Sequence, residues 1–343
     1  MLRLETEIVT VHTRHPFVIA RGGSSEWRTV TVRLIDVDGV EGWGEAAPSR
    51  FYGETADTVV AVLERLRPII EESDPWAIEA TERAMASAIR GNAAARMAVS
   101  AALHDLLGKR LGQPVWKLWG LSPAASPRSS FTIAIAADDD TLRARVREAV
   151  DAGYPILKVK LGTARDERIM RIVRDAAPDA TLRVDANAAW TAKRALGMIP
   201  FLQELGVEFV EQPCAAHDLD GTRFVRERSA LPIVVDESCL VATDVARLAG
   251  VADGVNLKLA KCGSLREALR IVHTARAHDL LVMAGCMIET SLGISAAAQL
   301  APLLDAVDLD GAALLADDPY VGATIARGVV TLPDAPGLGV TRR

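Results

Sequence analysis

The spacing of hydrophobic residues changes along the chain, and this change divides it into two parts. Residues 29–48 (TVTVRLIDVDGVEGWGEAAP) alternate apolar with polar positions and contain Asp38-Gly39, a pattern that predicts a β-hairpin. Apolar residues at helical spacing follow at residues 54–70 and 92–112. We therefore expect a separate α+β capping domain over residues 1–122.

From about residue 128 onward, short runs rich in valine and isoleucine alternate with helical stretches. Several runs end in a charged residue, and these residues follow one another at intervals of 22 to 26 positions: Lys160, Asp185, Glu211, Asp236 and Lys258. Asp308 ends a later run and leaves room for one uncharged unit near Cys286. One βα unit needs about 30 residues or fewer. The pattern predicts an α/β fold, a TIM-type (β/α)7β barrel, over residues 123–315.

In such a barrel the carboxyl ends of the strands meet at one mouth, which would gather a mixed set of charges there. The set comprises Lys158, Lys160, Asp185, Glu211, Asp236, Lys258, Asp308 and Asp310. A single Asp at a strand end is more often a helix cap than a ligand, but coincidence on successive strands favours a shared site. Asp185, Glu211 and Asp236 offer hard oxygen ligands without thiolate or imidazole, which predicts Mg²⁺.

Two lysines flank these acids in sequence, so we expect Lys160 and Lys258 to face each other across the mouth. One amine on each face of a carbon suits proton removal beside a carboxylate, where a divalent ion stabilises the enediolate. A lysine with the usual pKa of about 10.4 is protonated at neutral pH. We expect Lys158 and the metal charge to lower the pKa of Lys160, while Lys158 stays charged and holds a substrate carboxylate oxygen.

These motifs resemble the enolase superfamily, in its muconate-lactonising-enzyme-like subgroup, over nearly the whole chain. In the predicted barrel the likeness includes the segments LKVKLG, RVDAN, VEQP, VVDESC and NLKLAKCGSL. It implies one Mg²⁺ held by Asp185, Glu211 and Asp236. It also implies that the C-terminal tail, residues 316–343, packs back against the cap.

The same resemblance implies an acid/base pair of Lys160 and Lys258, with Lys261 as the rival for the second base. A narrower likeness, carried by GCMIETSLGISAAA (285–298) and DLDGAALLADDPY (308–320), is to dipeptide epimerases, including those acting on L-Ala-D/L-Glu. This likeness implies that the substrate α-ammonium binds between two carboxylates, those of Asp308 and Asp310. Carboxylates at positions i and i+2 of a strand face one side, in agreement with that role, although a loop cap is the alternative.

Three further positions are candidate substrate contacts. Thr132 and Met287 match positions near the substrate in the dipeptide epimerase group. Arg21 precedes Gly22-Gly23 in the cap, the part of the fold that selects the side chain in this family. An arginine fork suits a second substrate carboxylate such as a glutamyl side chain, and a surface salt bridge is the alternative.

The implied function is Mg²⁺-dependent inversion of the α-carbon of a dipeptide's C-terminal residue by two-base 1,1-proton transfer through an enediolate. Other reactions of the superfamily remain open: o-succinylbenzoate synthase, N-acylamino acid racemase and lactonising cycloisomerase. Two further alternatives lie outside it. One is a Schiff-base aldolase with a nucleophilic lysine, and the other is an inactive binding or scaffold protein.

Composition narrows the expected partners to small molecules. The net charge is −6 at pH 7 and no basic block stands out, so we expect no nucleic-acid partner. The start of the chain lacks the order of a secretory signal, and no uncharged apolar stretch reaches the 20 or so residues that span a bilayer. We expect a cytoplasmic enzyme without a membrane partner. Because large apolar barrels often associate, we also expect a homo-oligomer.

Overall fold

The alternating segment near the N-terminus forms an antiparallel sheet in the computed structural model, which describes residues 2–343. Its strands, in the order β1-β2-β3, are β1 (Arg3–Ile19), β2 (Gly22–Ile35) and β3 (Glu41–Ala46). The predicted hairpin joins β2 to β3, and the Asp36 carboxylate there accepts the backbone N–H groups of Asp38 and Val40 at 2.8 and 3.0 Å. Met1, the first residue of the predicted cap, lies outside the described residues.

Helices cover one face of this sheet. The two helices that the sequence predicts are α1 (Ala56–Glu71) and α3 (Ala93–Leu111). A third, α2 (Ile78–Ala88), buries Thr81 and Glu82 along with its apolar residues, which breaks the helical hydrophobic pattern. A Cβ on Gly44 would lie 2.0 Å from the carbonyl oxygen of Ala98, so only glycine lets β3 lie this close to α3. Two short segments, η1 (Arg50–Tyr52) and α4 (Val115–Leu118), complete the unit, and η2 (Pro123–Ala125) follows before the first barrel strand.

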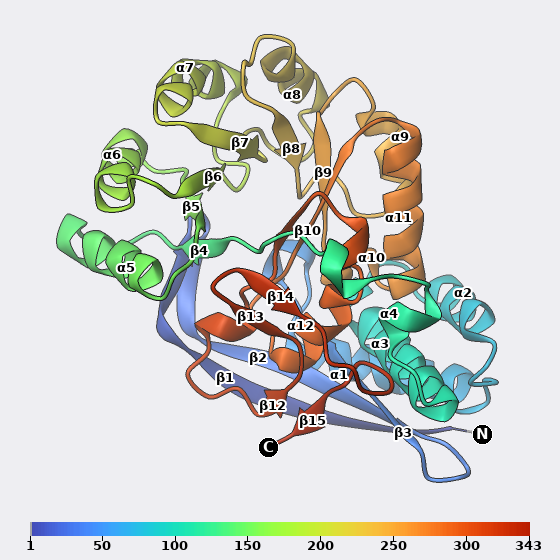
Figure 1. The fold of residues 1–343 in the computed structure, drawn as a ribbon. Coiled ribbons are helices and arrows are strands. Elements are labelled where there is room, and N and C mark those ends of the chain that lie inside the picture. The colour runs from blue at the N-terminus through green and yellow to red at the C-terminus, as the bar shows by residue number, and fades with distance from the viewer. Residues whose placement is uncertain (1) are drawn as a thin grey trace.

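Eight parallel strands form the second unit, with helices around them (Figure 1). In sheet order they are β11 (Ala306–Asp308), β10 (Leu281–Gly285), β9 (Gly254–Leu257), β8 (Ile233–Val235), β7 (Val207–Glu211), β6 (Thr181–Asp185), β5 (Ile156–Lys160) and β4 (Phe131–Ile133). A parallel bridge between Ser129 and Val307 joins the two edges of this sheet. Strand order and near closure confirm the predicted (β/α)7β barrel.

The strands are connected by helices that lie outside the barrel. They are α5 (Asp139–Asp151), α6 (Asp166–Ala176), α7 (Ala192–Glu204), α8 (Leu219–Arg226), α9 (Ala242–Leu248), α10 (Leu259–Cys262), α11 (Leu265–Ala277) and α12 (Ser291–Ala298). The short segments η3 (Ala301–Leu303) and η4 (Ala312–Leu314) flank β11. None of the helices within residues 2–343 has both the length and the apolar character needed to cross a membrane.

The register of the barrel strands sets the charged strand ends side by side. Lys160 pairs with Asp185, and Asp185 pairs with Glu211. Glu211 pairs in turn with Val234, two residues before Asp236. Because the strands are parallel, their carboxyl ends open at the same mouth, where barrel active sites lie. The fold therefore brings these charges together before any side-chain detail is considered.

The C-terminal tail touches both units. Its strands β12 (Tyr320–Val321) and β15 (Thr341–Arg342) pair with each other, and the Tyr320 hydroxyl lies 2.8 Å from that of Thr31 in the cap. The hairpin of β13 (Thr324–Ala326) and β14 (Val329–Thr331) meets the barrel, where the N–H of Ser129 donates to the carbonyl of Gly328 at 2.7 Å. The domain boundaries at residues 122 and 315 stay a prediction.

Two buried carboxylates meet where the cap joins the barrel. Glu45 of β3 accepts the hydroxyl of Thr290 and the N–H of Gly293, the latter at 2.9 Å, while Glu289 accepts the N–H of Met287 at 2.8 Å. A Cβ on Gly293 would lie 2.6 Å from Oε2 of Glu289 and 3.2 Å from Oε2 of Glu45. Burial, and then the charge of Glu45, raises the pKa of Glu289 to about 8. Glu289 is therefore protonated at neutral pH.

Replacing this residue, Glu289→Gln, should make stability less dependent on pH. Glu289 ionises near pH 4.5 in the unfolded chain and near 8 in the folded one, so unfolding releases a proton between these values. Stability of the wild type should then fall across this range, by about 1.4 kcal/mol for each unit of pKa difference. Glutamine does not ionise, so the variant should gain free energy of unfolding relative to the wild type as the pH rises. Urea unfolding at pH 5 and pH 8.5 measures this, and an equal difference at both values would contradict it.

Candidate active site

Three buried carboxylates converge at the mouth of the barrel. Asp185 ends β6, Glu211 ends β7 and Asp236 directly follows β8. One oxygen of each lies within 4.8 Å of the other two, and each residue is at most 2% exposed. Among residues 2–343 this is the only set of three or more acidic, histidine or cysteine side chains grouped closely enough to share an ion. The structure thus brings together all three predicted ligands.

The backbone after two of these carboxylates adopts left-handed conformations. Asn187 and Ala188 have φ values of 46° and 63°, and Gln212 has a φ of 36°. Such a conformation costs about 1–3 kcal/mol in a residue with a side chain, and it clusters at functional sites. The side chain of Gln212 helps to hold the arrangement, because its oxygen accepts the N–H of Asp236 and its amide donates to the Ser238 hydroxyl at 2.8 and 2.9 Å. The loops that follow β7 and β8 are therefore joined.

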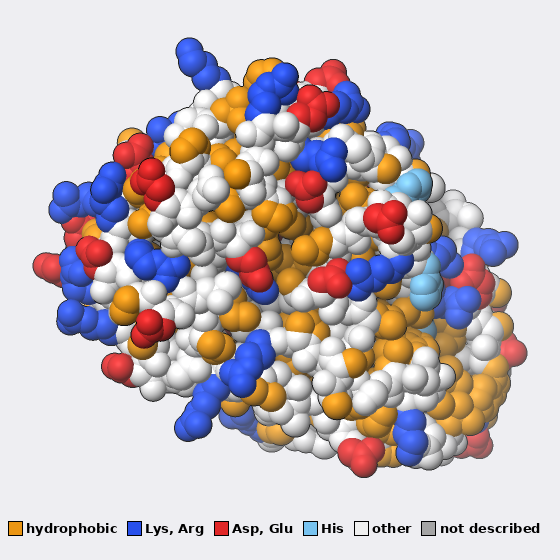
Figure 2. Space-filling view, turned by 45° about the horizontal axis from the view of Figure 1, so that its top comes forward, with side chains coloured by type: hydrophobic (Ala, Val, Ile, Leu, Met, Phe, Trp, Pro, Cys, Tyr) orange, Lys and Arg blue, Asp and Glu red, His pale blue; other side chains and the backbone are white. Residues whose placement is uncertain are grey.

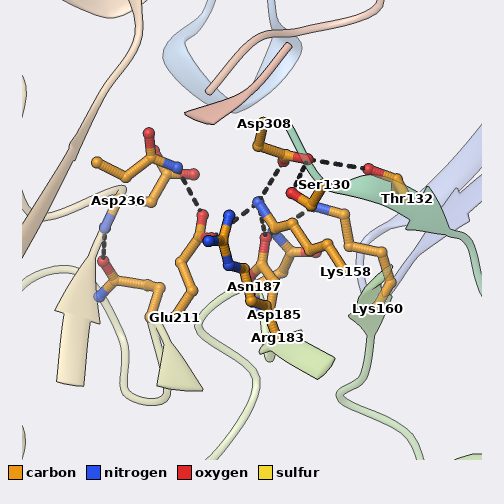
Figure 3. Close-up of polar contacts among 12 residues, drawn as sticks. Ser130, Thr132, Lys158, Lys160, Arg183, Asp185, Asn187, Glu211, Asp236 and Asp308 are labelled. Carbon is orange, nitrogen blue, oxygen red and sulfur yellow. Dashed lines mark hydrogen bonds and ion pairs between the residues drawn. The ribbon is translucent and has the colours of Figure 1, made fainter. Parts of the chain in front are cut away.

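Lys158 lies among the carboxylates (Figure 3). Its Nζ is 2.8 Å from Glu211, 2.8 Å from Asp308 and 3.4 Å from Asp185. Burial alone would lower the pKa of Lys158, but the charges of Asp308, Glu211 and Asp185 raise it well above the ordinary lysine value. Lys158 is therefore charged. Lys158 and Lys160 would repel each other alone, and the carboxylates that the sequence predicts at the same mouth neutralise both lysines in the structure.

Two amines approach the carboxylates from opposite ends. Nζ of Lys160, at the end of β5, lies 2.7 Å from Asp185, and Nζ of Lys258, just past β9, lies 2.9 Å from Asp236. Strands β5 and β9 are separated by β6, β7 and β8 in the sheet order. Lys160 and Lys258 are 6% and 8% exposed, so both amines are nearly shielded from water. This is the arrangement that the sequence predicts for an acid/base pair.

Lys261, the rival second base, has a different environment. Its Nζ donates to Oδ1 and to the carbonyl oxygen of Asp236, both at 2.5 Å, and to the carbonyl oxygens of Asn256 and Cys239 at 2.9 and 3.0 Å. An ammonium has three N–H donors, and these acceptors use all of them. The geometry therefore makes Lys261 a fixed support for Asp236 and favours Lys258 as the second base.

A second pair of carboxylates lies beside Lys158. Asp308 accepts the hydroxyl of Ser130 at 2.8 Å, and Asp310 accepts the backbone N–H of Thr132 at 2.6 Å. The Thr132 hydroxyl lies 3.5 Å from Asp308 and 3.3 Å from Asp310, so both carboxylates face the same threonine. Burial, and then the charge of Asp308, raises the pKa of Asp310 to about 7. A cation at this pair would relieve the repulsion between them.

Two further candidate substrate contacts, Arg21 and Met287, lie near the barrel mouth. Arg21, in the turn between β1 and β2, donates to Oε1 of Glu237 at 2.7 Å and to the carbonyl of Asn187 at 2.5 Å. Arg21 is exposed, and its ion pair with the buried Glu237 is the salt bridge that was the alternative; this pair joins the cap to the barrel mouth. Met287 follows β10, and its N–H donates to Glu289 at 2.8 Å. Contact of Arg21 and Met287 with a substrate stays a prediction.

The charge state of the site suits a cation. Burial would raise the pKa values of Asp185 and Asp236, but the ammonium groups of Lys160 and Lys258 hold both below the ordinary range. Burial, followed by the charge of Asp185, raises the pKa of Glu211 to about 7. The first two acids are therefore ionised at neutral pH. The positive charge of a divalent ion would favour the ionised form of the third acid, Glu211.

Buried oxygens without a hydrogen-bond partner near the three carboxylates show whether the site suits Mg²⁺. Four buried oxygens there accept no hydrogen bond: Asn187 Oδ1, Glu211 Oε2, Glu237 Oε2 and Asn256 Oδ1. For Glu211 Oε2 the ion pair with Lys158 is the remaining contact. All four are acceptors, so they call for donors, which the waters of a hydrated cation provide. A set of hard oxygens without nitrogen or sulfur suits Mg²⁺, and the residues present fit that ion.

Sequence reasoning missed several polar residues around the carboxylates. Asn187 donates to Asp185 at 3.1 Å, and Asn256 donates to Glu211 at 2.8 Å. Glu237, which pairs with Arg21, was missed as well. Asn187 and Glu237 lie within two residues of a strand-end acid, and Asn256 lies two residues before Lys258. Polar residues next to the charged strand ends were therefore the available signal.

Comparison with known families covers both units of the fold. Residues 3–120 match the family described as mandelate racemase / muconate lactonizing enzyme, N-terminal domain, and residues 141–343 match that described as enolase C-terminal domain-like. The chain is 40% identical over 330 residues to an L-Ala-D/L-Glu epimerase of Bacteroides thetaiotaomicron, covering 96% of this chain and 85% of the relative. It is 39% identical over 341 residues to an L-Ala-D/L-amino acid epimerase of Maribacter sp., covering 99% of each.

Solved structures with the same fold include enzymes of more than one reaction. A dipeptide epimerase from Cytophaga hutchinsonii, complexed with Mg and D-Ala-L-Val, superposes with a TM-score of 0.95 at 28% identity, over 99% of this chain and 95% of that one. A dipeptide epimerase from Enterococcus faecalis V583, complexed with Mg and L-Leu-L-Tyr, superposes with a TM-score of 0.94 at 31% identity, over 99% of both chains. An N-succinyl Arg/Lys racemase from Bacillus cereus superposes with a TM-score of 0.92 at 26% identity, over 99% of this chain and 95% of that one.

The fold, the three carboxylates between two amines and the family matches over both units agree with one another. The chain belongs to the mandelate racemase/muconate lactonizing enzyme group of the enolase superfamily.

Proposed function

We propose that this protein is a Mg²⁺-dependent dipeptide epimerase that inverts the α-carbon of the C-terminal residue, with one ion per subunit. The observation that carries the proposal is the pair of amines, Lys160 and Lys258, on opposite sides of one group of three carboxylates that could hold an ion. Relatives named for epimerisation of L-Ala-containing dipeptides support it. We further propose that the enzyme is cytoplasmic and forms a homo-oligomer.

The two lysines perform the proton transfers. One amine removes the α-proton from its side of the substrate, and the ammonium on the opposite side returns a proton to the other face. An α-proton beside a carboxylate is a very weak acid, so the enediolate formed by its loss needs stabilisation. Lys158, charged and buried, donates to a substrate carboxylate oxygen in place of its longest contact, the one to Asp185 at 3.4 Å. Mg²⁺ on the three carboxylates would supply Lewis-acid stabilisation of the developing negative charge.

The second carboxylate pair positions the other end of the substrate. Asp308 and Asp310 both face Thr132, and they lie beside Lys158. A dipeptide carries its carboxylate and its α-ammonium at opposite ends, so one site of each kind fixes its direction. The ammonium binds Asp308 and Asp310 by charge-assisted hydrogen bonds. Lys158 then lies between the two subsites.

Arg21 is the candidate for selecting the side chain of the inverted residue. It lies at the rim, with its guanidinium over the ring of Phe51 and held by Glu237. Those two contacts, and one to Asn187, leave some of its five N–H donors without a partner. They suit an acidic side chain, so we propose L-Ala-D/L-Glu as the preferred substrate type.

A second function in the same superfamily shares most of this machinery. An N-acylamino acid racemase, an o-succinylbenzoate synthase or a lactonising cycloisomerase would use the same lysines and ion. The Bacillus cereus racemase has the same fold. The carboxylate pair favours the dipeptide, because an N-acyl substrate brings no ammonium to neutralise Asp308 and Asp310.

On the face shown in Figure 2, positive and negative side chains are interspersed, which gives no support to a nucleic-acid partner.

Removing either catalytic lysine should separate hydrogen exchange from epimerisation. Lys160→Ala and Lys258→Ala should each reduce epimerisation of L-Ala-L-Glu by about 10²–10⁴-fold, because each removes one proton-transfer group. Each variant should still exchange the α-hydrogen of one epimer with D₂O, and the two variants should act on opposite epimers. Mass spectrometry of L-Ala-L-Glu and L-Ala-D-Glu, with Mg²⁺ and after EDTA treatment, measures this.

The control for this experiment is Lys117→Ala, a substitution in α4 of the cap, which should leave both rates unchanged. Exchange of the same epimer by both lysine variants would contradict the two-base mechanism. Full wild-type exchange after removal of the ion would contradict the metal requirement.

Neutralising one member of the carboxylate pair should separate the two candidate functions. Asp310→Asn keeps the shape and an acceptor for the N–H of Thr132, but it removes the charge that attracts the ammonium. We expect kcat/KM for L-Ala-L-Glu to fall at least about 100-fold, the size of a lost buried charge pair. Asp317→Asn, a matched change at an exposed pair with His12, should leave it unchanged. Steady-state kinetics measures both, and a small effect of Asp310→Asn would favour an N-acyl or cyclising substrate.

A further inference from the structure

The turn between β1 and β2 reaches from the cap to the loops that carry the proposed metal ligands. Arg21 in this turn donates to the carbonyl oxygen of Asn187 at 2.5 Å and to Oε1 of Glu237 at 2.7 Å. Asn187 lies two residues after Asp185, and Glu237 directly follows Asp236. One arginine therefore joins the cap to two of the three metal-ligand loops.

The turn is also packed tightly against the barrel and the rest of the cap. The Cζ atom of Arg21 lies 4.3 Å from the centre of the Phe51 ring in η1. A Cβ added to Gly162, which follows β5 with a φ of +104°, would lie 2.7 Å from Cβ of Ala20. The position of the turn therefore depends on how the loops at the mouth are arranged.

The two residues that hold Arg21 each have a second oxygen that is unused. Asn187 Oδ1 and Glu237 Oε2 are buried and accept no hydrogen bond, and each residue is only 4% exposed. Glu237 does not join the carboxylates whose oxygens lie within 4.8 Å of one another, so it is not placed as a direct ligand. Mg²⁺ usually keeps several of its waters, and these waters donate hydrogen bonds to acceptors just outside the direct ligands.

We infer that Glu237 and Asn187 are positioning residues that couple Mg²⁺ binding to docking of the β1–β2 turn. Waters of a bound ion would donate to Oε2 of Glu237 and Oδ1 of Asn187, the two buried oxygens without a partner, and would fix both side chains. The same fixation orients Oε1 of Glu237 and the Asn187 carbonyl toward Arg21. Glu237 lies 2.7 Å from the guanidinium of Arg21, and when ionised it would attract both the ion and the guanidinium, which offsets the repulsion between these two cations. The inference rests on the Mg²⁺ site of the proposed function but not on the identity of the substrate.

Coupling is reciprocal, so it is measurable from either end. In metal-stripped wild-type protein, saturating Mg²⁺ should slow hydrogen–deuterium exchange at the amides of residues 19–24 about fivefold, the lower range for linked sites. Glu237→Gln keeps the size of the side chain but removes its charge. Isothermal titration calorimetry should show Mg²⁺ binding about tenfold weaker in this variant. Saturating Mg²⁺ should then no longer slow exchange in the turn.

Two further variants keep the test decisive. Arg21→Met leaves every barrel carboxylate in place and should also abolish the Mg²⁺-dependent slowing, even if Glu237→Gln does not fold. Glu289→Gln changes another buried carboxylate between cap and barrel and should keep both the affinity and the slowing of the wild type. The inference would be overturned if Glu237→Gln kept the wild-type affinity for Mg²⁺ or the full slowing of exchange. It would also be overturned if saturating Mg²⁺ did not slow exchange in the turn of the wild type. Failure of the wild type to bind Mg²⁺ at all would instead refute the proposed metal site.

Discussion

The structure depends on the mutual neutralisation of buried charges at the mouth of the barrel. An unpaired charge in this environment would cost several kcal/mol, so each acid and each amine needs a partner of opposite sign. The strands supply these partners because parallel pairing sets Lys160 beside Asp185 and Asp185 beside Glu211. Acids and amines far apart in sequence thereby become neighbours, and they are held at fixed positions on rigid strands. The arrangement that offsets the cost of burying these charges also places an amine on either side of the proposed ion.

Lys158 connects the two halves of the proposed substrate site. It contacts Glu211 among the proposed metal ligands and Asp308 in the second carboxylate pair. A dipeptide bound with its carboxylate at the ion and its ammonium at Asp308 would therefore lie across this one side chain. The cap completes the enclosure through Arg21, which contacts the loops after β6 and β8. In the proposed function, the chemistry and the selection of the side chain belong to different units of the fold, which the contacts of Arg21 link.

Much of this arrangement was predictable from the spacing of charged residues. The intervals between the charged residues from Lys160 to Lys258 predicted the barrel strands. The three carboxylates at the ends of these strands lie together in the structure. Helix α2 was not predicted because Thr81 and Glu82 interrupt its apolar face. Contacts between distant loops were also out of reach, since sequence spacing does not report them. The pairing of Arg21 with Glu237 joins residues 216 positions apart.

The central claim is that three carboxylates share one cation between two amines. Anomalous X-ray scattering from a crystal grown with Mn²⁺ in place of Mg²⁺ tests it most directly. The account predicts one strong peak about 2.1 Å from an oxygen of each of Asp185, Glu211 and Asp236, with the amines of Lys160 and Lys258 on opposite sides of it. A peak bound to fewer than two of these carboxylates, or no peak at the mouth, would contradict the account.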